Sequence, residues 1–260
     1  MLNAVRKLGQ VLGLGEHGKM EATLPTIFHI THYKAGSQWV NRILHALAFE
    51  RLVMPEVENA QFLDKPLVAG AIYPTLYISH EQFDSVQIPK PWHRFVIIRD
   101  LRDSLISLYF SLKHSHAILT ETGRERRATF TDMGLEEGLL FVTENLLSGL
   151  AQIQWSWVAA GEELIKYEDL LENDEEILAR VLLRDCKLNV DVNQFHDAVR
   201  LNRFEARSGR PPGQEDLQSH ERKGIAGDWQ NYFTGKIAKA FKDRFGSLLV
   251  ATGYEKGFSW

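Results

Sequence analysis

Residues 31–39, THYKAGSQW, combine a lysine, a glycine and small polar residues in a pattern that suits the binding of a multiply charged anion. The apolar residues just before them are typical of a buried parallel strand, and apolar residues from Trp39 to Leu47 recur at helical spacing. The first N–H groups of such a helix, together with its dipole, favour an anion. Gly36 allows close backbone approach, and Lys34 supplies a positive charge. We therefore predict an oxyanion-binding loop between a strand and a helix.

This loop differs from the triphosphate-binding loop of kinases and ATPases. Its lysine precedes its glycine, and the pattern GxxxxGK(S/T) occurs nowhere in the chain. The dinucleotide pattern GxGxxG does occur at residues 13–18, but no strand-like run precedes it and Pro25 soon follows. We interpret residues 13–18 as a flexible connection.

A second anion-binding segment is predicted at residues 99–107, RDLRDSLIS. Arg99 ends an apolar strand, at the edge where open α/β sheets bind their ligands. Its guanidinium suits bidentate contact with a phosphate, and Ser107 follows two helical turns later. For Asp100 and Arg102 we favour a structural interpretation, as part of a solvated charge cluster that caps the helix.

A third segment is residues 221–234, ERKGIAGDWQNYFT. Arg222 and Lys223 precede Gly224, which places two cations and an unhindered backbone N–H group together. Such a combination suits a dianionic terminal phosphate.

In this order the three segments resemble the cytosolic-type sulfotransferases, which transfer a sulfuryl group from 3′-phosphoadenosine-5′-phosphosulfate (PAPS) to a hydroxyl or amine. The family patterns are TYPKSGTTW, R(N/D)xxDxxxS and RKGxxGDWKNxFT, and the third is matched almost letter for letter. The resemblance implies a P-loop-like α/β fold, no metal, and a site for PAPS and its product, 3′-phosphoadenosine-5′-phosphate (PAP). It assigns donor binding to Lys34, Ala35, Gly36, Ser37, Gln38, Trp39, Arg99, Ser107, Arg222, Lys223 and Gly224.

The resemblance also implies residues that contact adenine. Tyr167 lies in IKYEDLL, similar to the family strand that carries an adenine-contacting tyrosine, and Asn202 and Phe204 lie where the family has its TSF element. Trp39 would form the opposite wall of the slot. Aromatic walls of this kind stabilise a base by roughly 1–3 kcal/mol, although a strand tyrosine is more often simply packed.

Two residues are assigned to catalysis, Lys34 and His80. Sulfuryl transfer to an alcohol needs a base at neutral pH, and histidine is the usual choice. His80 ends LYISH, where the family has a KTH element that carries its base. His32 and His114 are the second choices.

The chain departs from the family pattern in several places. Ile78 stands where relatives often carry a lysine, and hydroxyl groups are lost at Ala35 and Gln38. The family's dimer-forming element, KxxxTVxxxE, is replaced by residues that do not match it, so the oligomeric state is left open. The positions concerned are Gln230, Thr234, Gly235 and Lys239.

The elements that must position these residues alternate along the chain. We predict strands at 26–32, 76–80, 94–99 and 163–168, and helices at 38–49, 101–114, 135–160 and 174–184. This alternation favours a single α/β domain, residues 26–260, whose central parallel sheet is flanked by helices. Residues 1–25 form an N-terminal extension, and the polar stretches 114–134 and 205–221 are predicted loops.

Composition excludes several classes of function. A net charge of −4 gives no support for nucleic-acid binding, and no apolar run is long enough to span a membrane. Cys186 is the only cysteine, which excludes an internal disulfide and fits a cytoplasmic location. No cluster of residues predicts a metal site.

Two other functions stay open from the sequence alone. One is a kinase or other phosphotransferase, and the other is a catalytically silent nucleotide-binding protein. The acceptor is a small molecule of unknown identity, whose pocket we expect to include the loop 114–134.

Overall fold

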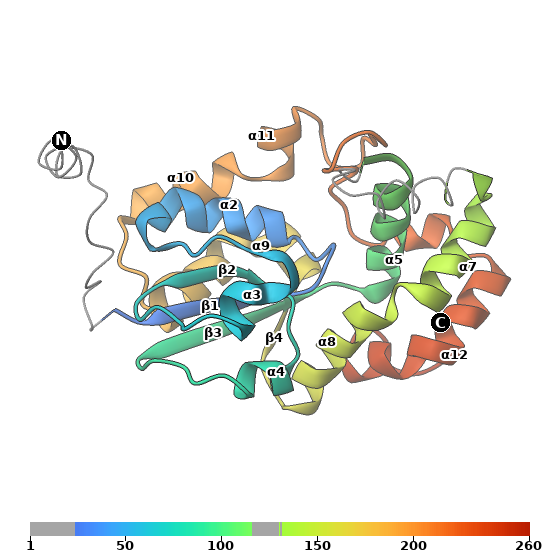
Figure 1. Ribbon diagram of the computed structural model, residues 1–260. Helices are drawn as coiled ribbons and strands as arrows, with labels where there is room; N and C mark the ends of the chain where they lie inside the picture. Colours follow the sequence, from blue (N-terminus) through green and yellow to red (C-terminus); the bar gives the residue numbers. More distant parts are fainter. Residues whose placement is uncertain (1–23, 116–129, 131) are drawn as a thin grey trace, which may run out of the picture.

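Four parallel strands form the central sheet in the computed structural model, which describes residues 24–115, 130 and 132–260 (Figure 1). The strands lie in the order β2, β1, β3, β4, and every pairing is parallel. Their bounds are Thr26–Ile30 for β1, Ile72–Leu76 for β2, Trp92–Ile98 for β3 and Leu164–Lys166 for β4. The predicted fold class, an α/β domain with a helix-flanked parallel sheet, is confirmed. Residues 1–23, including the GxGxxG pattern, and most of the loop 114–134 lie outside the described residues.

Helices cover both faces of this sheet, which explains why every residue of β1 is buried. On one face lie α2 (Ser37–Ala48), α9 (Tyr167–Leu178) and α10 (Val192–Leu201), packed over Ile27 and Ile97. The other face is covered by α3 (Ala60–Leu63), α4 (His80–Asp84) and α8 (Ser148–Ala159), packed over Phe28 and Ile98.

A third group of helices lies beyond the carboxyl ends of the strands (Figure 1). It consists of α5 (Leu101–Phe110), α7 (Leu135–Asn145) and α12 (Gly235–Ala251), which share an apolar cluster with part of α8. Because α5 continues directly from β3, this group positions the residues that follow the strand.

Several element boundaries differ from the predictions. The predicted strand at 76–80 is wrong, because the second strand spans Ile72–Leu76 and ends where the prediction begins. Ser79 and Gln82 instead form a capping box that begins α4. The stretch 135–160 contains two helices rather than one, and the strand at 163–168 shortens to β4, so that Tyr167 begins α9.

Short helical segments complete the chain. Part of the predicted loop 205–221 is helical, as α11 (Phe204–Ser208). Two segments of π-helix extend α5 and α9, at Ser111–Ser115 and Ala179–Asp185. Turns of 3₁₀-helix lie at Phe49–Arg51, Val57–Asn59 and Asp228–Asn231.

Candidate active site

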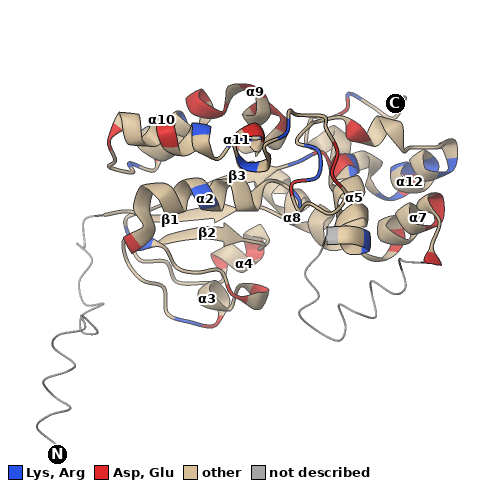
Figure 2. Ribbon diagram, turned by 90° about the horizontal axis from the view of Figure 1, so that it is seen from above, with Lys and Arg blue, Asp and Glu red and all other residues tan. Residues whose placement is uncertain are grey.

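A cavity of about 670 Å³ lies at the carboxyl end of the sheet, and the three predicted segments line it together. In Figure 1 the orange segment that follows α11 arches over this end of the sheet toward α5. Figure 2 shows the charged residues of that segment between α2 and α5. From the predicted site residues, the cavity lining includes Lys34, Gly36, Ser37, Gln38, Trp39, Arg99, Ser107, Tyr167, Asn202, Phe204, Arg222, Lys223 and Gly224.

The first loop, residues 31–37, turns sharply between β1 and α2. Lys34 and Gly36 both have positive φ angles, 70° and 81°, and Gly36 is the N-cap of α2. A Cβ atom at Gly36 would lie 2.8 Å from the ring of Tyr167, so only glycine fits. Ala35 is buried and, unlike the other predicted donor-binding residues of this loop, does not line the cavity. The first turn of α2, where backbone N–H groups lack partners within the helix, therefore lies at the cavity.

Lys34 contributes a positive charge with no carboxylate partner within the described part of the chain. Its ammonium group makes no hydrogen bond or ion pair there. Burial, together with the nearby cations Arg99 and Arg222, lowers the pKa of Lys34 to about 8. Three cations from distant segments therefore repel one another at this place, an arrangement that an anion would relieve.

Arg99 connects the first loop to the third segment. Its Nη1 donates to the carbonyl of Lys34 at 3.1 Å, and its Nη2 donates to the carbonyl of Ile225 at 3.2 Å. The guanidinium also lies over the ring of Tyr167, 4.6 Å from its centroid. Arg99 Nε and Trp39 Nε1 are buried without a hydrogen-bond partner among the described residues, which leaves N–H groups for a ligand.

Asp103 fixes the third segment, a role that we did not predict from the sequence. Its carboxylate accepts hydrogen bonds from the backbone N–H groups of Gly227 and Trp229 at 2.7 and 2.9 Å. It also lies 3.7 Å from the guanidinium of Arg99. The aspartate of the pattern R(N/D)xxDxxxS is the signal that points to it. Asp100 is the N-cap of α5 and accepts from the backbone of Arg102, as predicted. The two side chains are not solvated, however, because both are buried and pair with each other at 2.7 Å.

Carboxylates hold the cations of the third segment. Arg222 pairs with Glu215 and Asp228, and Lys223 Nζ lies 2.6 Å from Asp228. Gly224 has a positive φ of 64°, and a Cβ atom there would lie 2.4 Å from the ring of Phe204. The glycine thus allows the segment to pack directly on this aromatic side chain.

Aromatic side chains form the remaining wall. The rings of Trp39 and Tyr167 meet edge to face, with centroids 6.1 Å apart. Phe204 begins α11, and the side-chain amide of Asn202 donates to the carbonyl of Ala198. Ser107 lies at the cavity on α5.

His80 lies apart from these residues and does not line the described cavity. Its ring packs edge to face on Trp157, with centroids 5.0 Å apart, and its Nδ1 lies 3.4 Å from the carboxylate of Asp84. This position follows from the early end of β2, which places His80 in the first turn of α4.

The second-choice histidines differ in their surroundings. His32 is fully buried, with Nδ1 donating to the carbonyl of Tyr33 and Nε2 accepting from Gln154 and from the N–H of Arg99. Burial lowers the pKa of His32 to about 4. Since both ring nitrogens are engaged, we assign His32 a structural role. His114 lies in the π-helix after α5 and stacks on Phe110.

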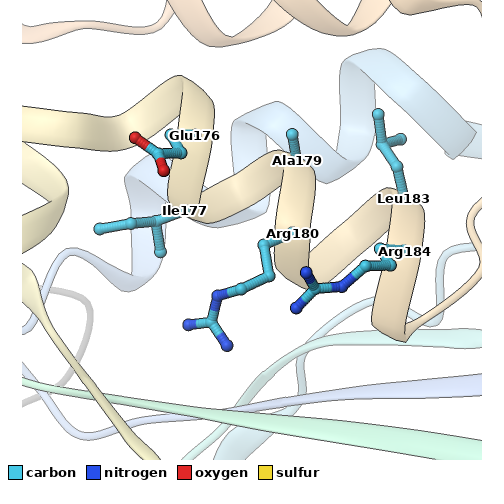
Figure 3. A pocket seen from close by; sticks show the side chains of 6 residues that line it. All are labelled: Glu176, Ile177, Ala179, Arg180, Leu183 and Arg184. Carbon is cyan, nitrogen blue, oxygen red and sulfur yellow. The ribbon is translucent and has the colours of Figure 1, made fainter.

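A second hollow, of about 570 Å³, lies along α9 and the π-helix that follows it (Figure 3). Its cations are already paired: Arg180 lies 2.7 Å from Glu163, and Arg184 donates to Asp185 at 2.9 Å. Unlike Lys34 at the main cavity, both arginines of this hollow therefore have a carboxylate partner.

Comparison with protein families adds independent information. The model of the sulfotransferase domain matches residues 24–253. Cytosolic sulfotransferase 3 of Arabidopsis thaliana is 23% identical over 232 residues, an alignment that covers 78% of this chain and 70% of the relative.

Solved structures show the same fold. Mouse sulfotransferase SULT7A1, complexed with PAP, superposes with a TM-score of 0.61 at 17% identity, over 88% of each chain. Retinol dehydratase, in complex with androsterone and the inactive cofactor PAP, gives a TM-score of 0.53 at 14% identity, over 89% of this chain and 82% of that one. Within the described residues, no helix is long and apolar enough to cross a membrane, and no three metal-ligating side chains of His, Cys, Asp or Glu gather.

Proposed function

The chain belongs to the sulfotransferase family, and from this premise we propose that it transfers the sulfuryl group of PAPS to a hydroxyl or amine of a small molecule. One observation carries the proposal: Lys34, Arg99 and Arg222, which come from three distant segments, share one cavity. A nucleotide with charged groups at both ends of its ribose needs cations in this arrangement. PAP is bound in both solved neighbours, which supports PAPS as the donor and PAP as the product.

The side chains at the cavity suit the parts of this donor. Lys34 and the backbone N–H groups of residues 35–38 would hold the sulfonate and the 5′-phosphate. Arg99, Ser107 and residues 222–224 would hold the 3′-phosphate, which supplies remote binding energy that positions the donor. The adenine would lie among Trp39, Tyr167, Asn202 and Phe204.

The carboxylates around Arg222 bear on how the 3′-phosphate binds. Asp228 is buried, whereas the side chain of Glu215 is one-third exposed. We expect the phosphate to take the place of Glu215 at the guanidinium, while Asp228 continues to orient it. The 3′-phosphate would then replace the Glu215 carboxylate as an anionic partner of Arg222.

His80 remains the proposed base. It follows the carboxyl end of β2, and its side chain is 24% exposed with the Asp84 carboxylate beside it. The acceptor would lie between His80 and the first loop and would lose its proton to the imidazole as its oxygen attacks the sulfur. Among the described histidines near the first loop, His32 is too deeply buried for this role.

The alternatives make different demands on the site. A phosphotransferase would need the triphosphate loop, which the chain lacks. A silent nucleotide-binding protein would bind PAP without turnover. A cytoplasmic location, in keeping with the name of the Arabidopsis relative, and a small-molecule acceptor are parts of the proposal.

Calorimetric titration of the protein with PAP and with ATP tests the choice of nucleotide. We expect PAP to bind at least tenfold more tightly, because only PAP carries a phosphate at the 3′ position. Tighter binding of ATP would contradict the proposal and favour a phosphotransferase.

Replacing Arg222 by alanine tests the 3′-phosphate anchor. A hydrogen bond to a charged group stabilises a complex by about 1.5–3 kcal/mol, so PAP affinity should fall by about ten- to a hundredfold. Arg184→Ala removes an exposed arginine at the second hollow and should leave PAP affinity unchanged. Equal PAP affinity of Arg222→Ala and the wild type would remove Arg222 from the site.

Screening small phenols, alcohols and amines with radioactive PAPS would identify the acceptor class. With an acceptor in hand, His80→Ala should slow transfer by roughly 10²–10⁴-fold while PAP affinity is retained. Wild-type protein that binds PAP yet transfers sulfate to no acceptor would favour the silent alternative.

A further inference from the structure

We propose that Tyr77 is an additional catalytic residue, whose O–H group donates a hydrogen bond to the sulfonate held by the first loop. This inference rests on the proposed function. It concerns a tyrosine just after β2, to which neither the motifs nor the comparisons assign a role.

The position of the hydroxyl group carries the inference. Tyr77 Oη lies 2.9 Å from Ser37 Oγ, and both residues line the cavity beside Lys34. Neither hydroxyl has another hydrogen-bond partner in the part of the chain that the structure describes. Two hydroxyls that bond to each other use one hydrogen and leave the second free. When Ser37 donates to Tyr77, the free hydrogen is that of Tyr77 Oη, and this O–H group can be donated to an anion in the first loop.

Several contacts hold Tyr77 in this position. The side-chain amide of Asn59 donates to the carbonyl of Tyr77 at 3.2 Å, and its oxygen accepts from the N–H of Tyr77 at 2.9 Å. Asn59 itself has a left-handed φ of 57°, as does Glu58 before it, a costly conformation that often marks functional sites. The ring of Tyr33 packs on that of Tyr77 with centroids 4.1 Å apart. The hydroxyl is thus preorganised.

The neighbouring residue shows why a tyrosine is useful here. Ile78 stands where relatives often carry a lysine, but its side chain is fully buried in the apolar cluster around Phe28 and Trp157. Successive residues in extended chain point to opposite sides, so Tyr77 faces the first loop. Burial raises the pKa of Tyr77 to about 12, which keeps its proton in place at neutral pH.

In the transfer step Tyr77 keeps its proton throughout. The acceptor oxygen forms a bond to sulfur while the bond between sulfur and the 5′-phosphate oxygen breaks, and that oxygen takes the electron pair. The acceptor's proton passes to the proposed base, His80. Tyr77 would act by stabilising negative charge on the transferred group as this exchange proceeds.

Two matched variants test the proposal. Tyr77→Phe removes the hydroxyl at the cavity, whereas Tyr73→Phe removes the hydroxyl of a buried tyrosine in β2 that accepts from the N–H of Val68 and lies outside the cavity lining. The measurements are PAP formation from PAPS, with 2-naphthol as acceptor probe and with water alone, and PAP affinity by calorimetry. We expect Tyr77→Phe to lower kcat by roughly 10²-fold, with PAP affinity within threefold of wild type, and Tyr73→Phe to retain wild-type turnover.

The outcomes are distinct. Equal turnover of Tyr77→Phe and wild type would overturn the proposal, and so would an equal loss of kcat in the two variants. A loss of PAP affinity as large as the loss of kcat would assign Tyr77 to nucleotide binding instead, which also overturns it. Wild-type protein that forms no PAP from PAPS with any acceptor of the screen would contradict the proposed function itself.

Discussion

At the scale of single residues, Lys34 is the most informative side chain. A lysine with a φ of 70° is uncommon, and the bond from Arg99 to its carbonyl helps to hold the backbone there. This geometry brings its side chain to the cavity among like charges, without a carboxylate in the described residues to neutralise it. The protonation of Lys34 therefore depends on whether an anion is bound at the site.

The pH dependence of PAP binding follows from the lowered pKa of Lys34, about 8. Above this pH the free protein loses the proton, and an anion binds the protonated form more tightly. PAP affinity should therefore fall as the pH rises from 7.5 to 9.5, and binding at pH 8.5 should take up a proton. Calorimetry in two buffers of different ionisation enthalpy measures the uptake.

Lys34→Arg is the control for this prediction. Arginine stays charged over the whole range, so PAP affinity should not decline with pH and no proton should be taken up. Wild-type affinity that stays constant from pH 7.5 to 9.5 would contradict the assignment.

At the scale of elements, the site depends on contacts between the segment that follows α11 and the start of α5. Asp103 fixes Gly227 and Trp229, and Arg210 donates hydrogen bonds to the carbonyls of Glu221 and Arg222. Arg222 and Gly224 thus gain their positions from charged side chains elsewhere. The ring of Phe204 packs against the segment at Gly224.

Two glycine variants in this segment separate packing from backbone strain. Gly224 and Gly213 both have positive φ, but a Cβ atom at Gly213 would meet nothing within 4 Å. Backbone strain should cost each alanine variant about 1 kcal/mol of stability, and Gly224→Ala should lose more because its Cβ atom would overlap the Phe204 ring. Gly224→Ala should additionally weaken PAP binding by about tenfold or more, because the Phe204 ring must move. Calorimetry and urea unfolding distinguish the two effects, and equal PAP affinity of the two variants would contradict this account.

At the scale of the whole molecule, two buried histidines make the fold sensitive to acid. His29 donates to the carbonyl of Pro74 and stacks on Phe95, and His32 joins the first loop to Arg99 and Gln154. Burial lowers the pKa of each to about 4, below its usual value of 6.5. Both are held neutral in the folded protein.

Stability should therefore decrease as the pH falls below 6.5, where the unfolded chain takes up protons that the folded protein excludes. Each histidine contributes up to about 1.4 kcal/mol per pH unit below pH 6.5 until its folded-state pKa is reached, so the free energy of unfolding should fall by about 3 kcal/mol between pH 6.5 and 5. Urea unfolding at these pH values measures it. His29→Gln should reduce the slope by about half, and an unchanged slope would exclude His29 as its source.

The sequence predicts the parallel sheet and the meeting of three cationic segments, because short motifs encode a strand, a turn and the helix that follows. It does not predict what depends on packing between distant parts. The bond between Tyr77 and Ser37 joins two elements, and Asp103 acts on residues more than a hundred positions away. The position of His80 in the first turn of a helix could have been predicted, since the capping box of Ser79 and Gln82 can be recognised in the sequence.

Cys186 offers a practical route to measuring motion in this protein. The only thiol of the chain is buried, and burial raises its pKa to about 12. Reagents that react with thiolates should therefore not modify it. A cysteine introduced at the exposed Gln218 would then carry a fluorescent label selectively. Changes in the emission of that single dye would report movement of the segment that follows α11 as nucleotide binds and dissociates, without further engineering of the native sequence.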